Sequence, residues 1–308
     1  MKILFTGASS FTGSWFVHQL HAAGHELTMT FRGEPHDYEG LRAERVIRTS
    51  KLGESLYGCA FGDKRFCQVA GRSTGWDLLC HHAADVTDYR SPAFDITAAV
   101  SLNSFNVRSV LQALDCPVLL TGSVFEPNEG AGSDGLPALS PYGLSKALTG
   151  QIFSYYVDIA GLPLGKFVIP NPFGPYEEPR FTSYLVRSWY NQKTPRVNNP
   201  AYVRDNVHVS LLARAYVAFS EQLRNSNCSM KLNPSGYIET QGAFADRFAG
   251  QMRKRLGLAC AVDLAEKIEF MEPRVRINTD PLDAADLNWC ESESWDAIAE
   301  FYERIFSR

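Results

Sequence analysis

Short apolar runs alternate with amphipathic stretches along the first half of the chain. Residues 2–5 form an apolar run that meets a glycine-rich turn, and Trp15, Phe16 and Leu20 then recur at helical spacing. The polar segment 33–56 gives no clear assignment. Further apolar runs predict strands at residues 26–31, 57–61, 77–84, 117–121 and 165–169, and periodic stretches predict helices at 100–114 and 141–160.

Strands that alternate with helices predict a parallel sheet covered by helices on both faces. After residue 170 the pattern loosens, because prolines and glycines are dense up to residue 200 and only two helical stretches follow, at 241–256 and 295–306. We therefore expect an α/β fold. Its doubly wound sheet would comprise residues 1–170 with part of 200–235, and a smaller mixed lobe would comprise mainly residues 171–308.

The 308-residue chain carries a formal net charge of −4 at pH 7, and its basic residues are scattered. This charge gives no general attraction to nucleic acid or to an anionic membrane, so neither is an expected partner. No apolar stretch is long enough to span a bilayer, and the first residues do not have the pattern of a signal peptide.

Seven cysteines occur in the chain, and no two of them form a CxxC pair. An odd number without such spacing predicts free thiols in a reducing compartment, and hence a cytoplasmic protein. The adjacent His81 and His82 point to opposite faces of a predicted strand, so they are not expected to share a metal. No metal site is predicted.

The turn after the first strand has the spacing Gly7-x-x-Ser10-x-x-Gly13. Glycines that follow a strand and open a helix allow the backbone to approach a pyrophosphate, and the helix N-terminus offers free N–H groups to it. Ser10 stands where the usual pattern has its middle glycine. The sequence therefore predicts a dinucleotide loop, and a plain strand–helix turn is the alternative.

The second predicted strand ends at Phe31-Arg32, without the acidic residue that usually holds the ribose hydroxyls of NAD. Arg32 is placed to pair with a 2′-phosphate, which favours NADP(H) over NAD(H). A solvated surface arginine is the alternative interpretation.

Tyr142 and Lys146 lie one helical turn apart and on one face of the predicted helix 141–160. An ammonium group beside a phenol stabilises the phenolate, so Tyr142 can exchange a proton near neutral pH while hydride moves. Thr121 and Ser123 stand at the carboxyl end of the preceding strand, where ligands bind in parallel sheets. Either hydroxyl is a candidate to hydrogen-bond the reacting oxygen, and turn chemistry is the alternative.

The chain resembles the extended short-chain dehydrogenase/reductase family, which includes sugar-nucleotide epimerases, dehydratases and reductases. The resemblance extends over nearly the whole chain, and it implies a Rossmann-type domain followed by a substrate-binding lobe. It rests on TGASSFTG at 6–13, HHAAD at 81–85, TGSVF at 121–125, YGLSK at 142–146, NPFGP at 171–175 and RDNVHV at 204–209.

By this resemblance, Thr121, Tyr142 and Lys146 are catalytic, since Thr121 stands four residues before Phe125, which replaces the usual tyrosine. The resemblance also implies substrate-binding roles for Asn171, Arg204 and Arg276, the last with an uncertain register. Ser123 is predicted to bind the substrate because it stands at the carboxyl end of the strand. The predicted cofactor-binding residues are Gly7, Ser9, Ser10, Phe11, Thr12, Gly13, Arg32, Asp63, Ala83, Ala84, Asn103, Tyr142 and Lys146, of which Arg32 departs from the usual pattern of the family and is included for its place after the second strand.

The main prediction is an NAD(P)-dependent oxidoreductase that reduces a 4-keto-sugar nucleotide, with Tyr142 as the acid. The first alternative is a sugar-nucleotide 4-epimerase with tightly bound NAD, and another is a non-catalytic NADP sensor on the same fold. Dehydration is disfavoured, because Gly122-Ser123 replace the Asp-Glu pair of family dehydratases. The family resemblance also implies a homodimer.

Overall fold

The computed structural model describes residues 1–133, 135–266 and 272–306. It divides the chain into two compact units, each of which is described by itself. Unit 1 comprises residues 1–129, 136–169 and 213–233, and unit 2 comprises residues 130–135, 170–212 and 234–308.

Unit 1 is built on one seven-stranded sheet in the order β11-β7-β5-β4-β1-β2-β3, and every pairing in it is parallel. This confirms the predicted doubly wound sheet of Rossmann type. Its strands are β1 (Lys2–Thr6), β2 (Glu26–Thr30), β3 (Glu54–Leu56), β4 (Leu78–His81), β5 (Val118–Ser123), β7 (Leu164–Ile169) and β11 (Met230–Leu232).

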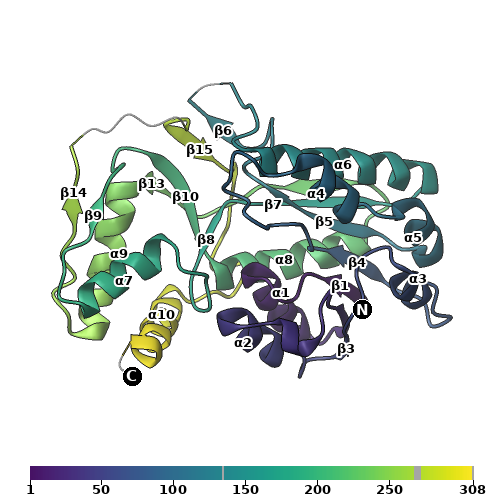
Figure 1. Cartoon of the computed structure of the whole chain (residues 1–308), viewed down its shortest axis with the longest axis horizontal. Coiled ribbons are helices and arrows are strands. Elements are labelled where there is room, and N and C mark those ends of the chain that lie inside the picture. Colours follow the sequence, from purple (N-terminus) through teal and green to yellow (C-terminus); the bar gives the residue numbers. More distant parts are fainter. Residues whose placement is uncertain (134, 267–271, 307–308) are drawn as a thin grey trace. The chain divides into compact units, whose positions relative to one another are not determined.

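Helices cover both faces of this sheet (Figure 1). Phe16 of α1 stacks on Tyr216 of α8 with ring centroids 4.0 Å apart, which packs α1 and α8 on one face. On the other face Phe153 of α6 is buried in one cluster with Leu120 of β5 and Val110 of α5. The helices are α1 (Phe11–Ala22), α2 (Gly40–Thr49), α3 (Lys64–Ala70), α4 (Ile96–Asn103), α5 (Val107–Leu114), α6 (Pro141–Ala160) and α8 (Val209–Arg224), and residues 35–37 form a 3₁₀ turn, η1 (Pro35–Asp37).

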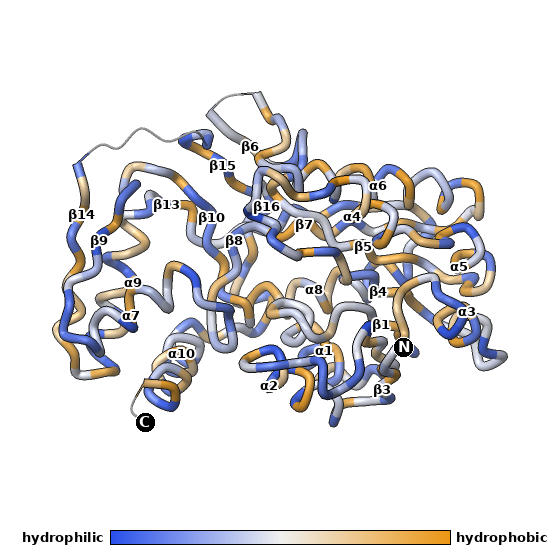
Figure 2. The backbone as a smooth tube through the Cα atoms, viewed as in Figure 1, coloured by the Kyte–Doolittle hydropathy of each residue, from blue (hydrophilic) through white to orange (hydrophobic). Residues whose placement is uncertain are grey.

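Burial on both faces explains why the central strands read as continuous apolar runs rather than as alternating patterns. All four residues of β4 are buried, and so are the first five residues of β5. Figure 2 shows hydrophobic segments in orange along β5, α6 and α8. Because β4 pairs in parallel with both β1 and β5, the carboxyl ends of these three strands lie side by side at one edge of the core. The candidate site residues lie at and just after these ends.

Unit 2 contains a five-stranded mixed sheet in the order β13-β10-β15-β6, with β8 also paired to β10. Phe173 of β8 packs against Phe244 and Phe248 of α9 and Trp295 of α10, which forms its aromatic core. Its elements are β6 (Ala131–Gly132), β8 (Asn171–Phe173), α7 (Phe181–Tyr190), β9 (Arg196–Val197), β10 (Val203–His208), β12 (Pro234–Ser235), β13 (Tyr237–Thr240), α9 (Gln241–Leu256), β14 (Asp263–Leu264), β15 (Val275–Ile277), β16 (Asp280–Pro281) and α10 (Glu291–Phe306).

Two sequence predictions for unit 1 differ from the structure, and one segment had no prediction. The strand predicted at 57–61 is wrong: β3 lies at Glu54–Leu56, and Gly58 has a φ of +56°, which ends extended backbone there. The helix predicted at 100–114 is two helices, because Asn106 has a φ of +51° between them. The unassigned segment 33–56 contains the amphipathic helix α2.

Candidate functional site

The loop after β1 is closely packed around its two glycines. A Cβ on Gly7 would lie 2.7 Å from the backbone nitrogen of Ala83, and a Cβ on Gly13 would lie 2.2 Å from the Gly7 carbonyl oxygen. Ser10 caps α1, since its Oγ accepts the Gly13 N–H at 3.1 Å and donates to the Gly7 carbonyl at 2.9 Å. Ser10, where the usual pattern has its middle glycine, therefore stabilises the loop and the start of α1. The loop fits a pyrophosphate, which needs close backbone approach at a helix N-terminus.

Side chains from α2 hold the same loop. Arg42 donates to the Ser9 hydroxyl at 3.1 Å, and Arg45 donates through Nε to the Ser9 carbonyl at 3.0 Å. Phe11 and Thr12 are buried in the first turn of α1. Sequence reasoning did not find the two arginines, because α2 lay in the segment without an assignment.

The end of β2 carries no carboxylate at the place where NAD-binding sheets usually have one. Phe31 is buried there and stacks on Tyr57, with ring centroids 4.9 Å apart. Arg32 is exposed, and we find no hydrogen bond or ion pair that joins it to another described residue. Its guanidinium is thus available to an anion.

His82 connects this loop to the end of β5, and sequence reasoning considered it only as a metal ligand. Its Nε2 lies 3.0 Å from Ser10 Oγ and 3.0 Å from Thr12 Oγ1, and its Nδ1 lies 2.9 Å from Thr121 Oγ1. Burial lowers the pKa of His82 to about 3, so the ring is neutral at physiological pH. The adjacent His81 instead bonds to Asn103 and stays buried in the core.

Ala83 and Ala84 follow β4 directly and are half-buried. The Ala83 N–H donates to Thr6 Oγ1 at 3.1 Å. Asn103, at the end of α4, is buried, and its Oδ1 accepts the Asp85 N–H at 2.8 Å. These contacts fix the strand end along which the resemblance expects the cofactor to lie.

Asp63 is the N-cap of α3. One carboxylate oxygen accepts the Phe66 N–H at 2.6 Å, and the other accepts the Ala60 N–H at 2.8 Å. Its position is therefore set by the backbone, and its contact with an adenine stays a prediction.

Helix α6 places Tyr142 in its first turn. Ser140 caps this helix by accepting the Gly143 N–H at 3.2 Å, and a proline follows at the first helical position. The Tyr142 ring makes edge-to-face contacts with Tyr89 and Phe94, with centroids 5.5 and 6.1 Å apart. The loop after β4 thereby fixes the plane of the phenol.

Lys146 is 5% exposed, and no hydrogen bond or ion pair connects it to the rest of the described chain. Burial lowers the pKa of Lys146 to about 8, the Glu126 carboxylate opposes this shift, and the Lys166 ammonium adds to it. A buried ammonium without a hydrogen-bond acceptor is suited to the hydroxyl groups of a ligand.

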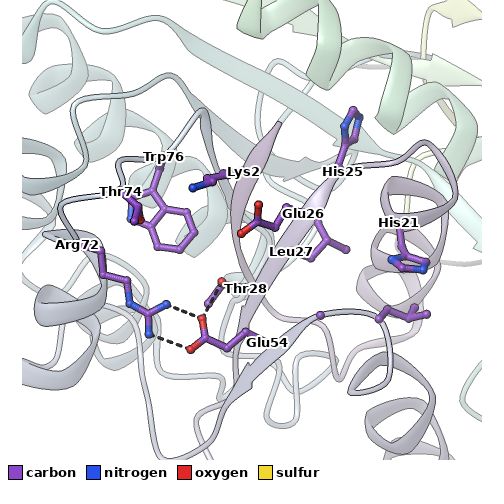
Figure 3. Close-up of a pocket in the computed structure, with 12 residues that line it drawn as sticks. Lys2, His21, His25, Glu26, Leu27, Thr28, Glu54, Arg72, Thr74 and Trp76 are labelled. Atoms are coloured by element: carbon purple, nitrogen blue, oxygen red, sulfur yellow. Dashed lines mark hydrogen bonds and ion pairs between the residues drawn. The ribbon is translucent and has the colours of Figure 1, made fainter.

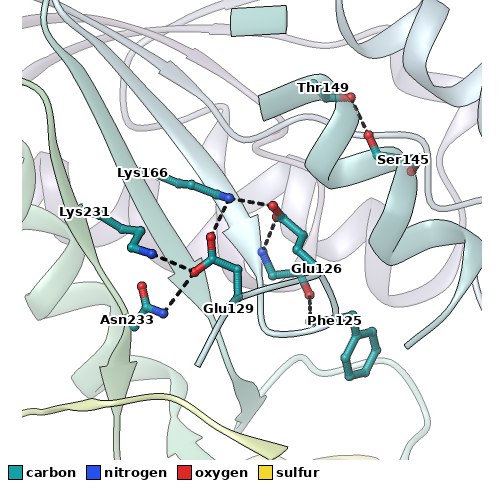
Figure 4. Close-up of polar contacts among 9 residues, drawn as sticks. Phe125, Glu126, Glu129, Ser145, Thr149, Lys166, Lys231 and Asn233 are labelled. Atoms are coloured by element: carbon teal, nitrogen blue, oxygen red, sulfur yellow. Dashed lines mark hydrogen bonds and ion pairs between the residues drawn. The ribbon is translucent and has the colours of Figure 1, made fainter. Parts of the chain in front are cut away.

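Beside α6 lies a group of polar and charged residues that we call the buried charge cluster, because Glu126 and Glu129 at its centre are buried: Glu126, Glu129, Lys166, Lys231 and Asn233 (Figure 4). Lys166 on β7 donates to Glu126 at 2.6 Å and to Glu129 at 2.7 Å. Glu129 also accepts from Lys231 at 3.2 Å and from Asn233 at 3.1 Å. Glu126 is fully buried, so its charge needs these partners.

The cluster explains the glycine after Thr121. A Cβ on Gly122 would lie 2.8 Å from Lys166 Cε and 3.0 Å from Glu126 Oε1. The same Glu126 oxygen accepts the Ser123 N–H at 2.7 Å. An Asp-Glu pair at 122–123 does not fit this arrangement, which agrees with the expectation that dehydration is disfavoured.

Three predicted substrate-binding residues lie on adjacent strands of unit 2. Arg204 of β10 is in register with Arg276 of β15, and Asn171 of β8 is in register with Asn206 of β10. Arg204 forms an ion pair with Glu272 at 2.9 Å, and Arg276 is buried. The amide nitrogen of Asn206 is buried and has no hydrogen-bond partner among the described residues.

Beside Arg204, unit 2 has a pocket of about 470 Å³. Half of its lining residues are aromatic or basic, a composition that suits stacking on a nucleobase and binding of phosphate. The pocket is lined by Phe181, Tyr184, Arg196, Val197, Asn198, Asn199, Tyr202, Arg204, Gln241 and Glu272.

A second pocket, of about 280 Å³, lies in unit 1 at the amino-terminal edge of the sheet (Figure 3). Lys2 and Glu26, the first residues of β1 and β2, line it, and an ion pair between Arg72 and Glu54 closes one side. Ligands bind at the opposite, carboxyl edge of parallel sheets, so this pocket is not the candidate site.

Comparison with known proteins adds a family match and structural relatives. The NAD dependent epimerase/dehydratase family matches residues 3–233. No curated protein sequence matches the chain.

No helix in the described ranges has the length and apolar content needed to cross a membrane.

Solved structures of similar fold cover nearly the whole chain at low sequence identity. UDP-glucose-4-epimerase from Stenotrophomonas maltophila, with bound NAD and formylated UDP-arabinopyranose, has a TM-score of 0.78 at 16% identity, and the match covers 99% of this chain and 98% of that one. Pal from Bacillus thuringiensis has a TM-score of 0.75 at 16% identity, with 99% and 100% covered. UDP-glucuronic acid 4-epimerase from Bacillus cereus, in complex with UDP-glucuronic acid and NAD, has a TM-score of 0.71 at 16% identity, with 99% and 100% covered.

Proposed function

The chain belongs to the NAD dependent epimerase/dehydratase family, and from this premise we propose that it is a sugar-nucleotide epimerase that oxidises and re-reduces one alcohol carbon. The observation that carries the proposal is the pairing of Tyr142 with the buried Lys146 on α6, in the same unit as the dinucleotide loop. The solved epimerases of similar fold support it.

The cofactor would be held by the loop from Gly7 to Gly13 and by Lys146. Gly7 and Gly13 would leave the room that the pyrophosphate needs, and Lys146 would donate to the hydroxyls of the ribose beside the nicotinamide. A bound nicotinamide supplies a hydride acceptor or donor for the carbon of the substrate.

Tyr142 handles the proton of the reacting hydroxyl. The Lys146 ammonium stabilises the phenolate, so Tyr142 accepts the hydroxyl proton on oxidation and returns it on reduction. The contacts with Tyr89 and Phe94 hold the phenol in one orientation during both half-reactions.

Unit 2 would bind the nucleotide part of the substrate. Arg204 and Arg276 supply positive charge for a diphosphate, and Asn171 and Asn206 supply amide donors. The pocket beside Arg204 would take the base, with Tyr184 and Tyr202 available for stacking.

One observation favours a second candidate, an NADPH-dependent 4-keto-sugar-nucleotide reductase. Arg32 is exposed at the end of β2 where a carboxylate would favour NAD, and this supports binding of a 2′-phosphate. Cofactor consumption separates the two candidates. An epimerase interconverts C4 epimers without net change in its cofactor, whereas a reductase oxidises one NADPH for each keto sugar reduced.

The experiment that tests the proposed chemistry replaces Tyr142 by phenylalanine. Loss of the proton carrier should lower kcat by at least about 10²-fold on UDP-sugars, and dinucleotide affinity should change little. Tyr155→Phe is the matched control, because Tyr155 is an exposed tyrosine on the same helix. If Tyr142→Phe keeps wild-type turnover, the proposed function is wrong.

We also propose that the protein is a homodimer. Leu102 and Phe105, in α4 and the turn after it, and Tyr155 and Ile159, on α6, are apolar or aromatic side chains that are each more than half exposed. Exposed apolar residues gathered on two adjacent helices are typical of a protein interface.

A cytoplasmic location stays a prediction.

A further inference from the structure

The side chain of His82, the first residue after β4, lies between two parts of the proposed site. Its Nε2 is 3.0 Å from Ser10 Oγ and 3.0 Å from Thr12 Oγ1, at the start of α1. Its Nδ1 is 2.9 Å from Thr121 Oγ1, at the carboxyl end of β5. One ring therefore contacts the dinucleotide loop on one side and, on the other, the hydroxyl that the family resemblance implies as catalytic.

Packing fixes the position of the His82 ring. Phe16 of α1 meets it edge to face with ring centroids 5.2 Å apart, and the centroid of Phe5 on β1 is 6.1 Å from it. A Cβ on Gly13 would lie 2.7 Å from His82 Cδ2, so the ring also lies against the backbone of the dinucleotide loop. Because the ring is enclosed in this way, each of its nitrogens keeps its own partners.

Both contacts suit a neutral ring, whichever nitrogen carries the proton. Burial lowers the pKa of His82 to about 3, so the ring is neutral at physiological pH. A neutral imidazole has one N–H donor and one acceptor nitrogen. The hydroxyls of Thr12 and Thr121 can each donate or accept, so a hydrogen bond is available on both sides of the ring.

Thr121 has a second side-chain partner and still has capacity for a substrate. Tyr216 of α8, whose ring stacks on Phe16 with centroids 4.0 Å apart, forms a side-chain hydrogen bond with Thr121. A hydroxyl takes part in up to three hydrogen bonds, because it has one proton and two lone pairs. His82 and Tyr216 account for two of them and orient the buried hydroxyl, which leaves one for the reacting oxygen of a substrate.

We propose that His82 is a positioning residue with one ring nitrogen for each part of the site: Nε2 holds the dinucleotide loop, and Nδ1 orients the hydroxyl of Thr121. This inference rests on the proposed function for the reaction in which Thr121 takes part, and it deepens that function by one residue. An apolar side chain of similar size at position 82 would fill the space without joining the two parts.

Asparagine and glutamine at position 82 separate the two contacts. The polar end of asparagine lies near the place of Nδ1, and that of glutamine lies near the place of Nε2. His82→Leu, which removes both contacts, should lower kcat on a UDP-sugar and raise the dissociation constant of the dinucleotide, each by about 10-fold. His82→Asn should restore kcat but not the affinity, and His82→Gln should restore the affinity but not kcat. Equal effects of the two variants on both constants would contradict the division of roles.

His18→Gln is the matched control for these variants. His18 lies on α1, and its buried Nε2 has no hydrogen-bond partner among the described residues, so this change should alter neither constant. Thermal unfolding checks that each variant is folded. If His82→Leu does not fold, the asparagine and glutamine variants still separate the two contacts, because each keeps a polar group at the site.

A double-mutant cycle with Thr121→Val tests the contact with the hydroxyl. His82→Gln should lower kcat in the wild-type background and have little further effect on kcat in Thr121→Val, where the hydroxyl is absent. Independent, additive losses of kcat in the two backgrounds would overturn the proposed action of His82 through Thr121.

The dissociation constants of NAD⁺ and NADP⁺ need no turnover, so failure of the proposed function and failure of the inference are distinguishable. If Tyr142→Phe keeps wild-type turnover, the proposed function is wrong, and weaker dinucleotide binding by His82→Asn than by His82→Gln still supports the contact with the loop. If those two variants bind the dinucleotide equally while Tyr142→Phe is inactive, the proposed function stands and the inference fails.

Discussion

Lys146 is a residue whose charge depends on a neighbour that the sequence does not reveal. The ammonium is needed to stabilise the Tyr142 phenolate, and burial lowers its pKa to about 8. The titratable and charged groups around it are Glu126, Lys166, and His81 and His82, whose pKa values of about 3 keep both rings neutral. Glu126 is the group in this set that favours the charged lysine.

This arrangement predicts how turnover depends on pH. As pH rises through about 8, Lys146 loses its proton and kcat should fall. Glu126→Gln removes the carboxylate that favours the ammonium, so the fall in kcat should begin at a lower pH than in the wild type. Glu129→Gln is the control, because Glu129 binds the same Lys166 but does not shift the pKa of Lys146. Identical pH–rate profiles for the wild type and Glu126→Gln would contradict the role of Glu126.

At the residue scale, those residues could be predicted from the sequence whose roles depend on their spacing along the chain. Gly7, Gly13, Tyr142 and Lys146 are recognisable because their roles depend on distance along a loop or a helix. Glu126 was not predicted, since a buried carboxylate and a surface one look alike in sequence, and its lysine partner, Lys166, lies far along the chain on β7.

At the scale of elements, the turn after Thr121 packs closely against strand β7. The space between them fits only a small residue at position 122. Gly122→Ala should destabilise the fold by about 1–3 kcal/mol, because the new Cβ meets Lys166 Cε at 2.8 Å. Gly250→Ala in α9 is the matched control. No atom lies within 4 Å of its added Cβ, so it should stabilise α9 by about 0.5–1 kcal/mol. Chemical denaturation measures both, and equal effects would refute the steric argument.

Elements with strong end signals were predicted to the residue. Helix α6 has Ser140 and a proline at its start and Gly161 after its end, and α9 lies between Thr240 and Gly257. Helices α7 and α8 were missed. Helix α7 lies in the proline-rich stretch 170–200, and α8 follows the strand β10 without a turn between them to mark its start.

At the scale of the whole molecule, the proposed homodimer makes a direct prediction. Ile159→Asp on α6 places a charge on the proposed interface, so the mass measured by light scattering should fall from that of a dimer to that of a monomer. Ile47→Asp, on the exposed side of α2, is the control and should leave the mass unchanged. A wild-type protein that is monomeric at micromolar concentration would refute the dimer.

The division of the chain was only partly readable from the sequence. The predicted change of pattern at residue 170 coincides with the end of β7, where unit 1 is interrupted. The sequence also predicts that part of residues 200–235 belongs with the sheet domain, and residues 213–233 lie in unit 1. The exact bounds of this segment were not predicted, because β11 is a three-residue edge strand that pairs with β7.

That interruption has a consequence for synthesis on the ribosome. Unit 1 cannot complete its sheet until β11 has been made, about as late as residue 232, although most of its strands emerge long before. Until then Glu129 lacks Lys231 and Asn233, two of its three partners in the buried charge cluster. We expect the β7 edge of the sheet to stay unpaired in the nascent chain, where chaperones can bind it. The contacts of Glu129, after the catalytic strand β5, should form last.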